Sequence, residues 1–315
     1  MSPEYPTCNT PVVLIAFNRP ELTRVVFERI ASVRPKRLLV VADGPRPSRA
    51  GEAELCRRVR DIATNVTWPC QVQTCFSEIN LGCKRRVISG LNWVFDNVEE
   101  AIVLEDDVLP DISFFRFCDE LLVRYRGDSR ISMISAFNVV ETEVPNDWSY
   151  YYSKLTHIWG WATWRDSWRR YDENLARWPE IKRAGLMNSL FPNGKQRQFW
   201  TSIFDRMHSG TGPDTWDFQW AYTNLMSHTL SIVPRVNLVR NIGFGPDATH
   251  TKDPDDGPAL QAKTLPFPLI HPAAMGSIEH LDELDGKICG NQPMSFTRRI
   301  ARELKRSLLG RGSSH

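Results

Sequence analysis

Short apolar runs alternate with stretches of helical spacing along the first 110 residues. The apolar runs predict four strands, at residues 12–17, 37–42, 70–76 and 101–104. The stretches between them predict three helices, at residues 21–33, 53–63 and 83–98. Regular alternation of this kind predicts an α/β fold, with a mostly parallel central sheet and helices on both of its faces.

The second half of the chain has a different pattern. Residues 147–220 contain nine of the eleven tryptophans, and residues 230–270 are rich in glycine and proline. There is no repeat and no low-complexity linker between the halves, so we expect one continuous domain over residues 1–290.

Charge is unevenly distributed along the 315 residues. The formal net charge is +2, but residues 295–315 carry six cations and one anion, net +5, which leaves −3 for the rest. In that tail Phe296, Ile300, Leu304 and Leu308 recur every four residues. We therefore expect a basic amphipathic helix over residues 291–315, which either binds an anionic membrane surface through residues 295–311 or packs on the body as a solvated helix.

Targeting and redox signals are absent from the sequence. No apolar run approaches the 18 or so residues needed to cross a bilayer, and none is typical of a signal peptide. The seven cysteines are an odd number and form no C-x-x-C pair. We expect free thiols in a cytoplasmic protein, without a zinc site.

Polar residues follow several of the predicted strands directly. Asn18 and Asp43 do so, and the acidic triplet Glu105-Asp106-Asp107 follows the fourth strand. Because the carboxyl ends of parallel strands share one edge of a sheet, these residues should line one crevice. Adjacent carboxylates repel one another unless a cation lies between them, which favours a divalent metal shared with a diphosphate. A solvated turn or a helix start is the alternative, and for Asp43-Gly44 an ordinary turn.

Two cations lie where loops lead into predicted helices. Arg19 and Lys84 could each neutralise phosphate or stack on a base there. A solvated helix start is the simpler explanation for either residue.

Tryptophans cluster closely around a glycine in the segment 157–164. Indole faces stack on the apolar faces of sugar rings, so Trp159, Gly160 and Trp161 are a candidate sugar platform. Alternatively Trp161, Trp164 and Trp168, spaced by three and four, form the buried stripe of a helix. We expect Trp164 and Trp168 to be core, and residues 159–161 to lie nearer the site.

Two acids and a loop histidine complete the candidates. Asp217 lies among aromatic residues that would favour a general base, and Asp214 lies three residues before it. Asp214 could instead be the N-cap of a helix whose first turn contains Asp217. His250 lies in a loop punctuated by glycines and could reach a metal or a diphosphate, although a lone histidine is more often simply exposed.

The order of these motifs resembles that of the nucleotide-sugar glycosyltransferases of the GT-A fold. The alpha-mannoside N-acetylglucosaminyltransferase type and bacterial family 2-like relatives are the most similar. The resemblance covers about residues 11–250 and consists of AFNR at 16–19, Asp43, VLEDD at 103–107, PDISFF at 110–115, ISAFN at 134–138, WGW at 159–161 and WD at 216–217.

The resemblance implies the roles of individual residues. Residues 11–110 would bind the nucleotide and residues 130–270 the acceptor. Asp107 would ligate Mn²⁺ or Mg²⁺, with a weaker match at His250, and Asp217 would be the catalytic base, with Asp214 as the alternate. The donor contacts would be Phe17, Asn18, Arg19, Asp43, Lys84, Glu105 and Asp106. Here Phe218 stands after Asp217, where the family has a second acid.

The resemblance thus implies an inverting, metal-dependent enzyme that transfers a sugar, UDP-linked in the donor, to a glycan or lipid-linked glycan. We expect it to be cytoplasmic, or peripheral on the inner face of the cell membrane, and not to bind nucleic acid. Two other functions stay open. A sugar nucleotidyltransferase would need a glycine-rich basic loop after the first strand, which residues 17–20 do not provide. A non-catalytic carbohydrate-binding protein is the second.

Overall fold

The computed structural model describes residues 7–144, 147–243 and 260–290. Its described strands are β1 (Val12–Ala16), β2 (Arg37–Ala42), β3 (Gln71–Phe76), β4 (Glu100–Glu105), β5 (Val108–Pro110), β6 (Ile131–Ser135), β7 (Tyr150–Ser153), β8 (Trp161–Trp164), β9 (Leu230–Pro234) and β10 (Val239–Asn241). Its described helices are α1 (Pro20–Val33), α2 (Glu52–Thr64), α3 (Gly82–Asn97), α4 (Ile112–Arg124), α5 (Arg165–Trp168), α6 (Trp178–Arg183), α7 (Leu186–Leu190), α8 (Gly194–His208), α9 (Asp217–Met226) and α10 (Glu279–Ile288), with a 3₁₀ turn at Glu141–Glu143.

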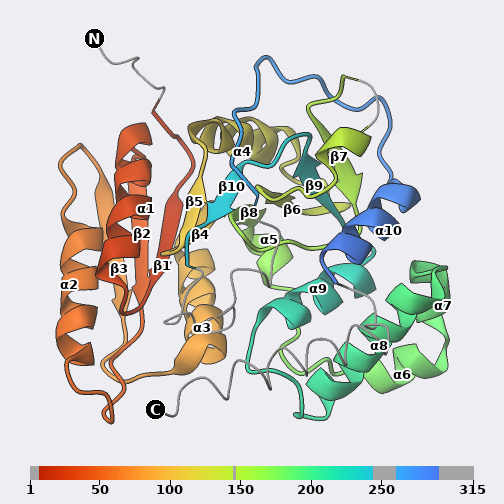
Figure 1. Ribbon diagram of the computed structural model, residues 1–315, viewed down its shortest axis with the longest axis horizontal. Coiled ribbons are helices and arrows are strands. Elements are labelled where there is room, and N and C mark those ends of the chain that lie inside the picture. Colours follow the sequence, from red (N-terminus) through yellow and green to blue (C-terminus); the bar gives the residue numbers. More distant parts are fainter. Residues whose placement is uncertain (1–6, 145–146, 244–259, 291–315) are drawn as a thin grey trace, which may run out of the picture.

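One eight-stranded sheet organises these elements, in the order β3-β2-β1-β4-β8-β6-β9-β7 (Figure 1). Six strands run in one direction, and β8 and β7 run against them. The predicted α/β class and mostly parallel sheet are confirmed. All seven elements predicted in the first 110 residues are present.

The chain reverses its direction of travel across the sheet between β1 and β4. It builds outward from β1 to β2 and β3, and then returns to the other side of β1 as β4. A crevice forms beyond the carboxyl ends of two strands that diverge in this way. The residues after β1 and β4 therefore lie beside this crevice.

Both faces of the sheet are buried, which explains the unbroken apolar runs of its strands. On β1, Val12 and Leu14 belong to one core, together with side chains of α1 and α4. Val13 and Ile15 belong to the opposite core, with α3 and several tryptophans. The side chains alternate because successive residues of a strand point to opposite faces.

The tryptophan-rich segment forms a strand rather than a helix. Residues 161–164 are β8, which pairs antiparallel with both β4 and β6. The spacing of three and four that suggested a helical stripe was therefore misleading. Trp164 and Trp168 are buried, as expected, but they lie on opposite sides of the sheet.

The segment between β8 and β9 is helical and has a core of its own. Trp178, Phe191, Trp200 and Phe204 are buried there with side chains of α9. Figure 1 shows α6, α7, α8 and α9 grouped beside the sheet. None of the helices in the described ranges is long and apolar enough to cross a bilayer. The basic tail predicted at 291–315 lies outside the described residues.

Candidate active-site groove

A groove of about 1050 Å³ lies at the carboxyl ends of β1, β2 and β4. Its walls come from the residues after each of these strands and from the starts of α1, α2 and α3. Six of the predicted site residues line it: Phe17, Asn18, Arg19, Asp43, Glu105 and Asp106. The rule that strand ends meet at one edge thus located these residues correctly.

An arginine and the acidic triplet join the two strands at the switch point. The guanidinium of Arg19 forms ion pairs with Asp106 and, at 3.0 Å, with Asp107. Asp106 is 2% exposed and also accepts a hydrogen bond from the Phe17 amide at 3.1 Å. The same carboxylate therefore ties the end of β4 to the turn after β1.

Negative charge exceeds positive charge at this end of β4. Burial raises the pKa of Glu105, and the neighbouring Asp107 and Asp106 raise it further. Burial also raises the pKa of Asp106, although Arg19 opposes that shift. One guanidinium does not neutralise three carboxylates, so this end of the groove favours a further cation.

Asp107 approaches the chain that follows β10. The Ile242 amide donates to the Asp107 carbonyl at 2.8 Å. A Cβ added at Gly243 would lie 2.2 Å from Asp107 Oδ2, so only glycine fits against this carboxylate. The segment that contains His250 begins directly afterwards and lies outside the described residues.

Asp43 caps α3 as well as lining the groove. Its carboxylate accepts hydrogen bonds from the amides of Leu81 and Gly82, at 2.9 and 3.0 Å, and from the Asn80 side chain at 3.0 Å. These donors include amides at the start of α3 that have no partner within the helix. Asp43 therefore holds the loop 80–82 against the end of β2.

Replacing Asp43 with Ala is expected to lower the free energy of unfolding by about 1–3 kcal/mol, because buried amides lose their acceptor. The measurement is urea unfolding followed by circular dichroism. Asp61→Ala is the matched control, since Asp61 pairs with Arg57 on an exposed helix surface, where such pairs contribute about 0–1 kcal/mol. Equal losses in the two variants would show that Asp43 is not a structural cap.

The sequence analysis missed a polar cluster on the rim of the groove. Buried Glu52 forms an ion pair with Arg46 and accepts from Asn18 Nδ2 at 2.9 Å. Hydrogen bonding from Arg46 lowers the pKa of Glu52 despite its burial. The Arg46 guanidinium also lies 5.4 Å from the centre of the Phe17 ring. Arg46 follows a predicted strand by four residues, so the strand-end rule that selected Asp43 could have found it.

Lys84 is not among the residues that line the groove. Its ammonium lies 3.7 Å from Glu173. The predicted nucleotide contact has no direct support in this arrangement, because the first turn of α3 directs the cation toward another part of the surface.

The two candidate bases lie close to the groove. Burial raises the pKa of the Cys83 thiol to about 12, together with the charges of Glu105, Asp217, Asp214 and Asp107. All four carboxylates are thus near one groove-lining thiol. Asp214 is adjacent to the start of α3, since a Cβ added at Gly82 would lie 3.7 Å from Asp214 Oδ2.

Asp217 is the first residue of α9 and accepts a hydrogen bond from the Thr215 hydroxyl. Asp214 is not the N-cap of this helix, because that position is Trp216. The first-turn position expected for Asp217 is confirmed. Tertiary packing brings both acids to the groove from residues more than 100 positions after β4.

The proposed sugar platform requires a correction. Trp161 is 0% exposed, and its ring stacks on Trp216 with 5.6 Å between ring centres. A fully buried ring cannot stack on a sugar, so Trp161 is a core residue. Gly160 has φ +69°, and a Cβ there would lie 3.2 Å from that of Ala136, which explains the glycine by backbone geometry. Trp159 is partly buried and packs edge-on against Phe137 at 5.1 Å.

All seven cysteines lie within the described residues and are free thiols, as expected. The expectation that none belongs to a metal site is taken up below for Cys289.

Comparisons with known proteins leave the family open. No family model matches the chain, and no curated protein matches it. Among solved structures, the chain is similar to a UDP-glucose pyrophosphorylase complexed with UDP-glucose. The two are 10% identical with a TM-score of 0.36, over 72% of this chain and 90% of that one. A likeness this distant carries no information about activity.

Proposed function

We propose that this chain is an inverting glycosyltransferase that uses a nucleotide-diphosphate sugar, UDP-linked, and a glycan or lipid-linked glycan acceptor. The groove at the β1–β4 switch point, with Arg19 paired to the acidic triplet, is the observation that carries this proposal. Ligands of open α/β sheets bind in such a crevice. Its volume is that of a small-molecule site.

The donor would lie with its nucleotide along the rim formed by Phe17, Asn18 and Arg46. The ring of Phe17 offers a stacking surface, and Arg46 and Arg19 are the cations beside it. Arginine is suited to phosphate, since its planar guanidinium binds two oxygens at once. Polar side chains on the rim then contact ribose and base.

A divalent cation fits the donor set at the end of β4. Asp107 offers carboxylate oxygens next to a groove with excess negative charge, and oxygen ligands are those that Mg²⁺ and Mn²⁺ prefer. Mg²⁺ is commonly held by one or two carboxylates together with substrate phosphates, which suits a single carboxylate such as Asp107. When bound, the cation would stabilise charge on the departing diphosphate.

Asp217 would act as the base. Its carboxylate takes the proton of the acceptor hydroxyl while that oxygen forms a bond to the anomeric carbon. The bond from this carbon to the diphosphate oxygen breaks, and its electron pair leaves with the nucleoside diphosphate. Attack opposite the leaving group inverts the configuration. Asp214 is the alternate base.

The test is a panel of nucleotide-sugars assayed with Mn²⁺ or Mg²⁺ for release of nucleoside diphosphate. We expect turnover with one donor, and expect it to fall to background in Asp107→Asn. Release or consumption of pyrophosphate instead would identify a nucleotidyltransferase. However, Arg19 leads directly into α1 and the loop before it contains no glycine. Sugar binding unchanged in Asp107→Asn, without turnover of any donor, would identify a carbohydrate-binding protein.

The cytoplasmic location, and membrane association through residues 295–311, stay predictions from the sequence. Each basic side chain near an anionic surface contributes about 1 kcal/mol to binding. The tail therefore has enough cations to hold the enzyme close to a lipid-linked acceptor.

A further inference from the structure

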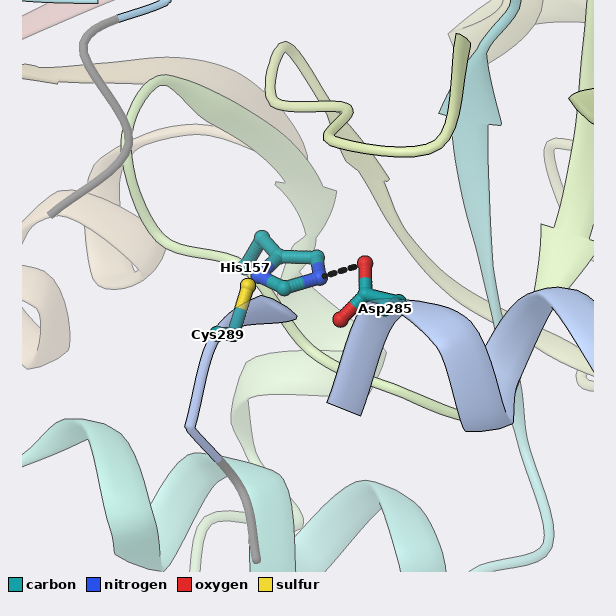
Figure 2. A group of neighbouring side chains, drawn as sticks. All are labelled: His157, Asp285 and Cys289. Carbon is teal, nitrogen blue, oxygen red and sulfur yellow. Dashed lines mark hydrogen bonds and ion pairs between the residues drawn. The ribbon is translucent and has the colours of Figure 1, made fainter. Parts of the chain in front are cut away.

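Three potential metal ligands meet at the end of α10, away from the residues that line the groove. Figure 2 shows His157, from the loop between β7 and β8, facing Asp285 in the last turn of α10 and Cys289 just after it. One ligand atom from each residue lies within 4.8 Å of the other two. No other group of three such residues in the described ranges meets this condition.

Local helix geometry places two of the ligands together. The Cys289 amide donates to the Asp285 carbonyl at 2.8 Å, which continues the helical pattern beyond Ile288. Residues four apart share one face of a helix, so the carboxylate and the thiol project in the same direction. His157 approaches this face from a segment about 130 positions earlier in the chain.

The carboxylate between them has an unused oxygen. Asp285 Oδ2 contacts His157 Nε2 at 2.8 Å. Asp285 is 2% exposed, and its Oδ1 is buried and receives no hydrogen bond of acceptable geometry. A buried polar atom without a partner costs about 1–3 kcal/mol, and native structures contain few of them. A cation bound between the three side chains would satisfy it.

The kind of ligand atoms selects the cation. Imidazole nitrogen, thiolate sulfur and carboxylate oxygen are the three ligand types that Zn²⁺ accepts, whereas Mg²⁺ and Ca²⁺ require oxygen. A thiolate and a carboxylate together cancel the charge of Zn²⁺, which removes the penalty of burying an unpaired charge. Three protein ligands leave one tetrahedral position for water.

We propose that His157, Asp285 and Cys289 bind one zinc ion that joins α10 to the loop before β8. Zinc ligands in a tetrahedral site lie about 3.3 Å apart for bonds near 2.0 Å, so binding replaces the His157–Asp285 hydrogen bond with two metal bonds. The thiol loses its proton as the metal binds. The ion would cross-link distant parts of the chain, because it binds the folded protein alone.

The experiment measures metal in the full chain, purified without a histidine tag or chelator. Elemental analysis should find about one zinc per chain in the wild type, and much less in Cys289→Ala. Cys70→Ala is the matched control, since Cys70 is a partly buried cysteine far from the cluster and should retain the zinc. Asp107→Asn should retain it too, which separates this ion from any cation in the groove.

Cobalt substitution decides the matter even where a variant does not fold. Wild-type protein stripped of metal and reloaded with Co²⁺ should show a thiolate-to-cobalt charge-transfer band, which a site made only of oxygens cannot produce. Chelation should also lower the melting temperature of the wild type. Wild-type protein without zinc, and without that band after reloading, would overturn the proposal and leave His157 and Asp285 as a buried ion pair.

Discussion

Asp217→Asn is expected to lower kcat for sugar transfer by about 10²–10⁴-fold, the usual contribution of a general base. The amide keeps the size of the side chain and its hydrogen bond from Thr215 but cannot take a proton. Donor affinity should stay within a few-fold, because the change removes an interaction with the acceptor hydroxyl. The measurement is steady-state transfer with the donor identified in the panel, together with donor binding by calorimetry.

Asp214→Asn is the matched control for this substitution. Both acids lie near Cys83, so the two changes alter the electrostatics of the groove in a similar way. If Asp214→Asn caused the large loss and Asp217→Asn did not, Asp214 would be the base. Full activity in both variants would contradict base catalysis by this segment.

Trp161→Ala is expected to lower the free energy of unfolding by about 3–5 kcal/mol, the usual cost of removing a buried aromatic side chain. Trp161 is fully buried and packs against Trp216, Trp220 and Trp168. Its removal would leave a cavity directly under β8. The measurement is denaturant unfolding, and a loss of this size could prevent the protein from accumulating in cells.

Trp159→Ala is the comparison, since Trp159 is two residues away and only partly buried. It should cost clearly less stability than Trp161→Ala. If Trp159 contacts the acceptor sugar, its variant should raise the KM for the acceptor while the fold persists. A Trp161→Ala protein as stable as the wild type would contradict the core assignment.

Local pattern was sufficient for the first half of the fold. The strands of the nucleotide half are apolar throughout because both faces of the sheet are covered, so their signal was strong. The helices between them follow from apolar spacing. The strand-end positions of Asn18, Asp43 and residues 105–107 followed from the same pattern, together with the geometry of parallel sheets.

Spacing misled where one period could describe two structures. Tryptophans at 161, 164 and 168 match a helical stripe, but the first two belong to a strand and the third to the short helix after it. The antiparallel pairing of β8 between β4 and β6 depends on partners more than 25 residues away in each case. No local window contains that information.

Long-range contacts also account for the residues that were missed or misplaced. Lys84 was chosen as a cation at a helix start, yet its neighbour is Glu173, almost 90 positions later. Arg46 was missed because its importance comes from Glu52 and the Phe17 ring. The cluster of His157, Asp285 and Cys289 shares no motif, because a loop and a distant helix end supply its members.

By itself, the sequence determined the α/β class, the alternation of the first seven elements and the placing of acids and amides at strand ends. These follow from side-chain periodicity and chain stiffness, which act over a few residues. Only the tertiary structure decided which charges are paired, that Trp161 is core, and that Asp214 and Asp217 reach the groove from a distant helix. Those outcomes depend on packing between segments far apart in the chain, and burial and pairing are properties of that packing.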